Sequence, residues 1–322
     1  MVPRLLADIG GTNARFALQR PGRRPGRAVV LRCHAFPTIE AATGAAIEHL
    51  RPAAPPRAAA IAVAAPVLGD AIAMTNHPWR FSQAALARAL GLDRLVVLND
   101  LAAVAHALPH LRARERRPIG AEPPPAADAP LAVIGPGTGL GIAALVPAAG
   151  RWIAVPGEGG HADLAPGTAR EDAVLAALRR RFGHVSLERA LSGPGLVNLY
   201  RALDVLADAP PPRRPPARTP AAITGRARAR TCPRAIATAA LFSALLGGAA
   251  GNLALTLGAR GGVYVAGGIV PRMGTAFDAA AFRRRFEAKG RFADYLAAVP
   301  TWLVTAPQPA LIGLAAALDA GR

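Results

Sequence analysis

A chain of 322 residues is long enough for two domains, because single hydrophobic cores stop growing near roughly 250–300 residues. Its 52% content of hydrophobic residues excludes a disordered chain, and since no uninterrupted apolar run approaches about 18 residues we expect no membrane segment. The formal net charge of +18 invites a nucleic-acid partner, but Lys289 is the single lysine and no aromatic residues are interleaved with the scattered arginines, so we expect no specific nucleic-acid binding.

The N-terminal segment reaches its first aspartate, Asp8, without a long apolar run, so we expect no secretory signal. Cys33 and Cys232 are too few for a disulfide framework in a chain of this length. Two free thiols in a cytoplasmic protein are therefore expected.

The first expected element is a β-hairpin, in which two short apolar runs flank the turn Asp8–Asn13. Gly10 and Gly11 let backbone N–H groups approach phosphate oxygens without obstruction, and Thr12 adds a hydroxyl donor. Tight hairpins use the same glycines, so a structural role and phosphate binding both stay open for this turn. If phosphate binds here, Asp8 at the end of the strand can orient Mg²⁺ through water.

Two apolar runs further along, Ala58–Ala65 and Leu95–Leu98, are typical of buried strands. Between them a helix is expected over Gln83–Leu90, because its leucines recur at helical spacing before a glycine. Strands that alternate with helices indicate an α/β fold.

Asn99 and Asp100 directly follow the second of these apolar runs and precede a helical pattern. A carboxylate at the carboxyl end of a strand, where α/β sheets open their ligand crevice, is well placed as a general base. Either residue could instead serve only as the cap of the next helix. Both interpretations of Asp100 stay open on this evidence.

A second strand–turn–strand pattern surrounds the glycine-rich segment Gly135–Gly141. Gly137, Thr138 and Gly139 repeat the glycine and threonine arrangement of the first turn about 125 residues later, which predicts a duplicated architecture with one glycine-rich turn in each half. The recurrence favours phosphate binding by both turns more than either turn does alone. The chain contains no GxxxxGK[ST] P-loop, and its strictly alternating glycines argue against a Rossmann dinucleotide site.

Glu158 and His161 stand in the glycine-rich segment Pro156–His161, a polar loop suited to hydrogen bonds with several hydroxyls of a sugar. Their spacing could instead suggest metal ligation, but the glycines oppose the helix that would carry such a site. Glu188, judged by position alone, is an exposed helical residue.

The remaining expected elements follow from apolar periodicity and from proline-rich composition. They are helices at Ala169–Phe182, Arg234–Leu257 and Leu311–Leu318, a strand at Gly262–Ala266, a loop at Arg114–Pro130 and a mobile insertion at Ala209–Pro220.

Seven motifs in order make the chain resemble the bacterial glucokinase family of the hexokinase-like, actin-like ATPase fold. They are Asp8–Arg15, Met74–His77, Asn99–Asp100, Gly137–Gly141, Pro156–His161, Leu191–Tyr200 and Ala266–Pro271. The zinc-binding cysteine cluster of the related repressor and kinase family is absent. Two departures are Pro136, where the family usually has a small residue, and the segment Pro210–Arg230, which is less similar to the family.

The resemblance implies particular roles for the residues of these motifs. The implied glucose site consists of Asn99, Asp100, Glu158, His161 and Glu188, with Asp100 taking the proton from the 6-hydroxyl. The implied ATP site consists of Asp8, Gly10, Gly11, Thr12, Gly137, Thr138, Gly139, Gly267 and Gly268, with Asp8 also holding Mg²⁺ through water.

The resemblance further implies a two-domain, ribonuclease H-like α/β fold with an active-site cleft between a small domain, at 1–110 plus 301–322, and a large domain at 111–300. The expected activity is ATP-dependent phosphorylation of D-glucose at the 6-hydroxyl, carried out by a cytoplasmic homodimer. Two alternatives remain, a kinase of another hexose and a non-catalytic sugar-sensing or nucleic-acid-binding protein.

Overall fold

The computed structural model describes residues 2–75, 77–206 and 219–320. The chain forms two compact units: unit 1 comprises residues 1–112, 148–156 and 306–322, and unit 2 comprises residues 113–147 and 157–305. Most of the proline-rich insertion expected at Ala209–Pro220 lies outside the described residues, which resume at Thr219.

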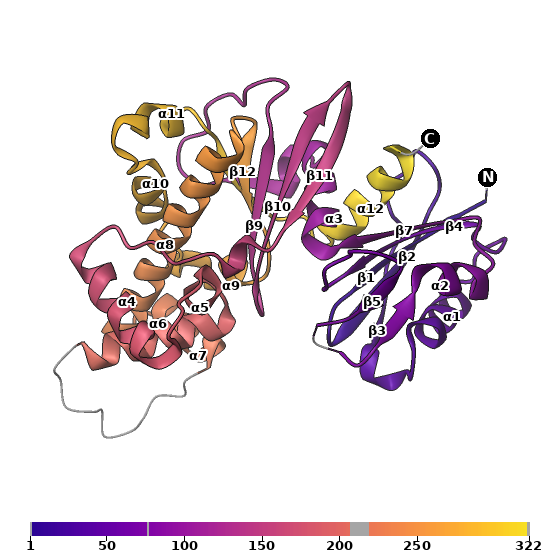
Figure 1. Cartoon of the computed structure of the whole chain (residues 1–322), viewed down its shortest axis with the longest axis horizontal. Coiled ribbons are helices and arrows are strands. Elements are labelled where there is room, and N and C mark those ends of the chain that lie inside the picture. The colour runs from indigo at the N-terminus through magenta and orange to yellow at the C-terminus, as the bar shows by residue number, and fades with distance from the viewer. Residues whose placement is uncertain (1, 76, 207–218, 321–322) are drawn as a thin grey trace. The chain divides into compact units, whose positions relative to one another are not determined.

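Unit 1 is built on a five-stranded sheet in the order β3-β2-β1-β4-β7 (Figure 1). In that order the strands are Val29–Arg32, Asn13–Gln19, Arg4–Ile9, Ala58–Val63 and Arg94–Asn99. β2 is antiparallel to β1, whereas β4 and the edge strand β7 run parallel to it, as is typical of an α/β sheet. The predicted hairpin and both predicted strands are confirmed, and β4 is buried as expected, whereas β7 is mostly half-buried and only its Val97 is fully buried.

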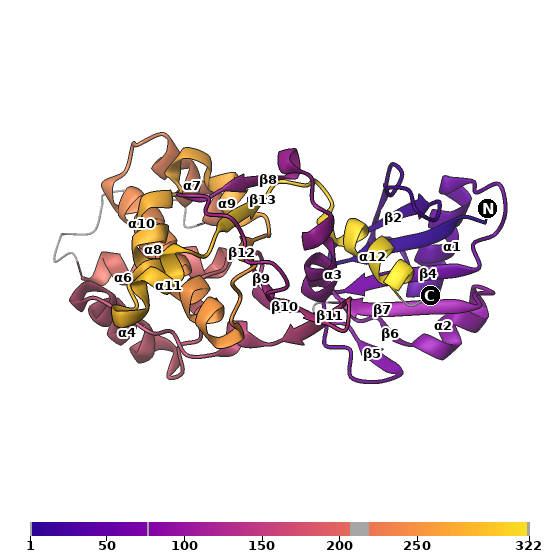
Figure 2. The ribbon, with the colours of Figure 1, turned by 90° about the horizontal axis from the view of Figure 1, so that it is seen from above.

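Helices cover both faces of the unit 1 sheet. α1 (Ile39–Leu50) and α2 (Gln83–Ala89) share one hydrophobic core with the strands. On the other face α3 (Asp100–Ala107) packs against α12 (Pro309–Ala320), which confirms the predicted last helix (Figure 2). These two helices approach so closely that a Cβ atom on Gly313 would lie 1.7 Å from the Ala103 carbonyl oxygen, so only glycine fits there.

Unit 2 is built on a six-stranded sheet in the order β11-β10-β9-β12-β13-β8. In that order the strands are Arg151–Gly157, Leu140–Ala148, Leu131–Pro136, Gly262–Val265, Thr301–Val304 and Arg116–Pro118. β10 is antiparallel to β9, whereas β12 and β13 continue parallel to it. The strands β9, β10, β12 and β13 thus repeat the arrangement of β1, β2, β4 and β7, and the predicted duplication is confirmed.

Two segments near the boundaries of the units differ from the sequence expectations. β13, which we expected in the small domain, belongs to the unit 2 sheet. Residues 148–156, which carry most of β11, belong by their contacts to unit 1.

The segment Arg114–Pro130, expected as a loop, contributes the edge strand β8. Its arginine-rich sequence has no alternation of apolar and polar residues. Side chains of the neighbouring strands hold β8 in place instead. The Arg116 guanidinium lies 4.4 Å from the centroid of the Trp302 ring and donates a 3.0 Å hydrogen bond to the Tyr264 hydroxyl. The Arg116 guanidinium over the Trp302 ring thus takes the place of an apolar side chain. The hydrophobic pattern of the sequence therefore did not indicate a strand.

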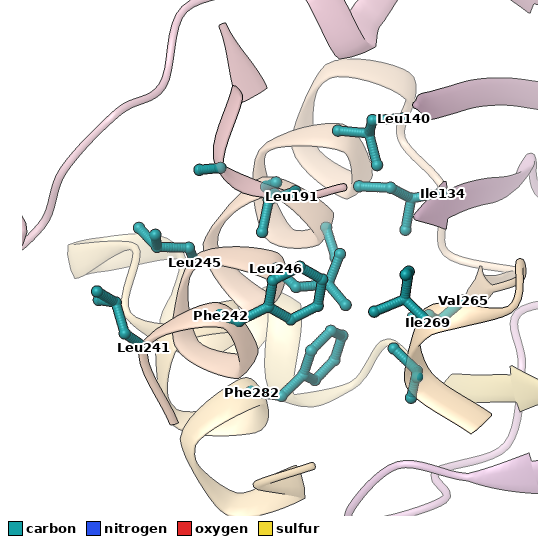
Figure 3. Close-up of a cluster of buried hydrophobic side chains, with 14 of the residues drawn as sticks. Ile134, Leu140, Leu191, Leu241, Phe242, Leu245, Leu246, Val265, Ile269 and Phe282 are labelled. Atoms are coloured by element: carbon teal, nitrogen blue, oxygen red, sulfur yellow. The ribbon is translucent and has the colours of Figure 1, made fainter. Parts of the chain in front are cut away.

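The long helix α8 (Pro233–Leu257) runs through the core of unit 2. It is long and apolar enough to cross a membrane, but most of it is buried, and its Phe242 and Leu246 pack with Phe282 of α10 (Figure 3). At Gly247 a Cβ atom would lie 2.1 Å from the Phe282 carbonyl oxygen, so the two helices meet backbone to backbone. α8 is therefore a core helix, as its many small residues allow.

The other described helices are short or lie around α8, and they include the predicted helix at 169–182. They are α4 (Ala169–Phe182), α5 (Leu187–Ala190), α6 (Gly193–Val205), α7 (Pro220–Arg228), α9 (Ile269–Met273), α10 (Ala279–Glu287) and α11 (Ala293–Ala297). The short 3-10 helices are η1 (Cys33–Ala35), η2 (Leu108–His110), η3 (Ala113–Glu115), η4 (Gly159–His161), η5 (Gly274–Ala276) and η6 (Gly290–Phe292), and β5 (Ala71–Ala73) pairs with β6 (Arg80–Ser82).

Candidate active site

The first glycine turn joins β1 to β2 and is held in place by the buried Cys33. The Gly10 amide donates to the Asn13 carbonyl oxygen at 3.0 Å and closes the turn. From η1, the Cys33 amide donates to the Thr12 carbonyl at 3.0 Å and the Cys33 thiol donates to the Gly10 carbonyl at 3.3 Å. The turn is thus rigid, while Thr12 itself is exposed and accessible to a ligand. Cys33 is a free thiol, as expected.

Asp8 lies at the end of β1, just before this turn, with 22% of its side chain exposed. Its Oδ2 atom is 3.4 Å from Nη1 of Arg15. Burial raises the pKa of the Asp8 carboxyl above its usual value, and the Arg15 guanidinium offsets part of this change. A half-buried carboxylate with a loosely held cation beside it has oxygen atoms available for a water-bound metal ion.

Replacing Asp8 with asparagine is expected to raise the free energy of unfolding at neutral pH. Because the folded-state pKa is raised, the ionised carboxylate destabilises the fold, and this cost develops as the pH rises through that pKa. In urea titrations the stability gain of Asp8→Asn over wild type should therefore grow from about pH 4 upward and then level off. The matched control Asp93→Asn changes a carboxyl that is 64% exposed and should shift stability far less. A gain that shrinks as the pH rises would contradict the prediction.

Asn99 and Asp100 lie where β7 ends and α3 begins, and the structure distinguishes their roles. Asn99 is the cap, since its Oδ1 atom accepts hydrogen bonds from the amides of Leu101 at 2.9 Å and Ala102 at 3.3 Å. Asp100 is the first residue of α3, and its Oδ1 atom accepts from the Leu101 amide at 2.8 Å. Capping is therefore accounted for by Asn99, and the Asp100 carboxylate is not needed for that purpose.

The strand register puts the predicted site residues of unit 1 on one edge of the sheet. Ile9 of β1 pairs with Val63 of β4, which pairs with Asn99 of β7. All three strands are parallel, so Asp8 and Asp100 lie at the same carboxyl-terminal edge, two strand spacings or about 10 Å apart. Unit 1 thus brings together the first glycine turn, Asp8, Asn99 and Asp100.

The second glycine turn joins β9 to β10 and is held by residues of α5 and α6. The Gly137 amide donates to the Gly139 carbonyl at 2.8 Å, and the Gly193 amide donates to the Gly137 carbonyl at 2.8 Å. Glu188 is half-buried, not exposed as its position suggested, and its Oε2 atom accepts a 2.9 Å hydrogen bond from the Leu140 amide. A Cβ atom on Gly139 would lie 2.5 Å from this Glu188 oxygen, which explains the glycine.

Gly267 and Gly268 follow β12 and cross the end of β9. Gly267 has a φ of +79°, and a Cβ atom there would lie 2.4 Å from the Pro136 carbonyl oxygen. Gly268 caps α9. Pro136 is the last residue of β9, so its missing N–H leaves the rest of the hairpin ladder intact.

Glu158 and His161 lie just beyond β11, with exposed side chains. The Glu158 Oε2 atom is 4.0 Å from the His161 Nε2 atom, and their side chains are 62% and 63% exposed. Their segment lies against the start of β10, because a Cβ atom on Gly160 would lie 2.0 Å from the Leu140 carbonyl oxygen. Leu140 therefore contacts both the Glu158–His161 segment and Glu188, and unit 2 brings its predicted residues together at one end of β10.

Two supporting residues, Ser192 and Gly193, were given no individual role in the sequence analysis. Ser192 caps α6 through the Gly195 amide at 3.0 Å and donates its hydroxyl to the Glu188 carbonyl at 2.8 Å. Together with Gly193 it ties α6 to both Glu188 and the second glycine turn. The serine followed by a proline two residues later is a helix-start signal that could have located this contact.

Comparison with known proteins connects the chain to one family. A family model described as Glucokinase matches residues 5–321. Glucokinases of Ralstonia nicotianae and Aromatoleum aromaticum are 51% and 50% identical to the chain over 98% of its length and 95% of theirs. The crystal structure of a glucokinase from an Antarctic psychrotroph is similar with a TM-score of 0.88 and 36% identity, over 99% of both chains.

Proposed function

The chain belongs to the glucokinase family and phosphorylates D-glucose with ATP, and we propose that Asp100 is the general base of this reaction. The fold is accordingly that of the two-domain actin-like ATPases. Support for the role of Asp100 comes from its place at the carboxyl edge of β1, β4 and β7, where a capping function is already fulfilled by Asn99.

In the proposed mechanism Asp100 accepts the proton of the sugar 6-hydroxyl as that oxygen forms a bond to the γ-phosphorus of ATP. The bond between the γ-phosphorus and the β–γ bridging oxygen breaks at the same time, and ADP leaves with that oxygen. The transition state is loose and spreads charge over the phosphoryl oxygens, so catalysis is mainly positioning and electrostatic stabilisation. The two glycine turns would supply backbone N–H groups for this purpose, from Gly11 and Thr12 and from Thr138 and Gly139, since the amides of Gly10 and Gly137 already donate within their own turns. Their hydrogen-bonded, rigid frames mean that little reorganisation is needed when phosphate binds.

The remaining hydroxyls of glucose would be bound by Asn99, Glu158, His161 and Glu188. Glu158 and His161 are exposed and have polar atoms available. The hydrogen bond from the Leu140 amide fixes the orientation of the Glu188 carboxylate in unit 2. The backbone of Gly267 and Gly268, which follows β12, would approach the adenosine.

We further propose that Asp8 holds Mg²⁺ through water. The fit rests on the half-buried Asp8 carboxylate beside the turn that would bind phosphate. When bound, the ion neutralises charge on the phosphate oxygens. Asp8 needs no direct contact with the ion, since Mg²⁺ usually keeps several of its waters.

We also expect a cytoplasmic homodimer in glycolysis, without membrane or specific nucleic-acid partners. The free thiols Cys33 and Cys232 fit a reducing compartment, and the apolar helix α8 is largely occupied by core contacts. Light scattering should give twice the chain mass of 33.0 kDa.

Initial rates with a panel of sugars test the substrate assignment. With ATP, kcat/KM should be highest for glucose and at least about tenfold lower for mannose, fructose and N-acetylglucosamine, because buried polar groups left unpaired by a wrong sugar cost more than 1.4 kcal/mol. Polyphosphate in place of ATP tests the phosphoryl donor. A higher kcat/KM for another hexose would overturn the assignment to glucose while leaving the phosphoryl-transfer mechanism in place.

A further inference from the structure

Unit 1 contains a cavity of about 570 Å³ that the proposed reaction does not use. Its walls come from the connection after β2, the end of α3 with η2, the start of β11, and α12. Every residue that lines it belongs to unit 1, and none is among the proposed glucose or ATP residues. The volume suits a small metabolite, since ligand pockets are typically about 300–1,000 Å³.

The charged side chains of this cavity favour an anion. The lining contains three arginines, Arg23, Arg24 and Arg151, and one carboxylate, that of Asp319, so its formal charge is +2. The Asp319 carboxylate is already engaged, because its Oδ1 atom lies 2.6 Å from Nη1 of Arg4 outside the lining. Guanidinium groups match phosphate with two parallel hydrogen bonds, which makes a phosphate the best-suited anion.

Two histidines strengthen the case for an anion. Burial lowers the pKa of His106, and the neighbouring His110 lowers it further. Burial and the Arg24 guanidinium likewise lower the pKa of His110, although Asp319 acts in the opposite direction. Burial is the largest cause of both shifts, and the positive charges of His110 and Arg24 act in the same direction, so an anion bound beside these groups would offset repulsion between them.

The rest of the lining is apolar and aromatic. α12 contributes Ile312, Ala315 and Ala316, and the β11 segment contributes the half-buried ring of Trp152. A ring-containing molecule would bury apolar area against these residues, which a bare phosphate ion could not do.

We propose that this cavity is an effector site for a small phosphate monoester that carries a sugar or nucleoside ring. The cavity borders His106 in the last turn of α3, the helix whose first residue is Asp100. α3 has eight residues and is about 12 Å long, so a shift at one end moves the other. The effect on catalysis, though not the binding itself, rests on the proposed role of Asp100. A bound effector would change kcat through the position of the base.

Binding can be measured by tryptophan fluorescence of the full-length protein, with glucose and ADP present to fill the active site. Trp79 and Trp302 are only 3% and 1% exposed, so the signal change should come from Trp152 and be lost in Trp152→Phe. The probes are glucose 6-phosphate and fructose 1,6-bisphosphate as sugar phosphates, AMP as a nucleotide, and inorganic phosphate. At least one ring-containing probe should bind more tightly than inorganic phosphate. The probe that binds most tightly shows whether the ligand is a sugar phosphate or a nucleotide.

The double variant Arg23→Gln/Arg151→Gln should weaken this binding by at least about tenfold, because two charge-assisted hydrogen bonds are lost. Its matched control, Arg179→Gln/Arg180→Gln, removes the same charge from exposed positions of α4 and should bind the probe like wild type. The same probe should change kcat in the wild type and not in Arg23→Gln/Arg151→Gln.

Absence of any fluorescence change up to about 10 mM probe, or equal weakening in the two double variants, would overturn the effector site. Binding that leaves kcat unchanged would overturn its coupling to Asp100. An incorrect assignment of Asp100 as the base would appear differently. In that case Asp100→Asn would retain normal turnover, and probe binding would be unaffected.

Discussion

Asp100→Asn should lower kcat by about 10²–10⁴-fold, the usual contribution of a general base. The amide has the shape of the carboxylate but cannot accept the proton of the 6-hydroxyl. The helix should stay intact, because Asn99 caps it through the amides of Leu101 and Ala102. Glucose binding should survive, so that kcat and kcat/KM fall together in a coupled glucose 6-phosphate assay.

Asp93→Asn is the matched control for this variant. It makes the same chemical change on an exposed carboxylate of unit 1 that pairs with the exposed Arg57. Its kcat should equal that of the wild type, and its stability should change by less than about 1 kcal/mol. Turnover of Asp100→Asn at the level of Asp93→Asn would remove Asp100 from the mechanism.

The second large effect is expected from Gly313→Ala, which should destabilise unit 1 by about 3 kcal/mol. The added methyl group would lie 1.7 Å from the Ala103 carbonyl oxygen and 2.8 Å from the Ala107 amide nitrogen, so α12 and α3 must separate. Overpacking of this kind typically costs 1–3 kcal/mol, and a clash with backbone leaves no side chain that could move aside. Since α3 carries Asp100, the activity per folded molecule should fall as well.

Gly44→Ala provides the matched control for this change. Gly44 lies inside α1 of the same unit, and a Cβ atom there would have nothing within 4 Å. Alanine should therefore stabilise the protein by about 0.5–1 kcal/mol, the usual advantage over glycine within a helix. Thermal unfolding should move in opposite directions for the two variants, and a rise in the unfolding temperature of Gly313→Ala would refute the close contact.

The sequence was informative where local chemistry determines local structure. The two glycine turns, the strands ending in Val63 and Asn99, and the helix α8 all follow from apolar runs and turn residues. The edge strand β8 did not, because it is held by Trp302 and Tyr264, which lie far away in the chain; Tyr264 is 148 positions from Arg116. Edge strands need little apolar periodicity of their own, so short-range patterns miss them.

The candidate site shows the same limit at the level of single residues. Whether Asn99 or Asp100 caps α3 could not be decided from their adjacency, since both side chains can accept backbone amides. Only the geometry assigns the cap to Asn99. Glu188 was likewise indistinguishable from a surface residue, because its partner, the Leu140 amide, is 48 positions away in the chain.

The repeated strand order shows which residues of the two halves correspond to the acids Asp8 and Asp100. When the last pairs of the two hairpins are matched, Ile9 with Ala14 and Pro136 with Leu140, the counterpart of Asp8 is Gly135. Following the register across each sheet makes Ala306 the counterpart of Asp100. Both acids thus stand in one half and have uncharged counterparts in the other. An ancestral duplication would then have diverged so that one half keeps its acids at the ends of its parallel strands, whereas the other half has uncharged residues there and takes its carboxylates, Glu158 and Glu188, from the segment after β11 and from α5.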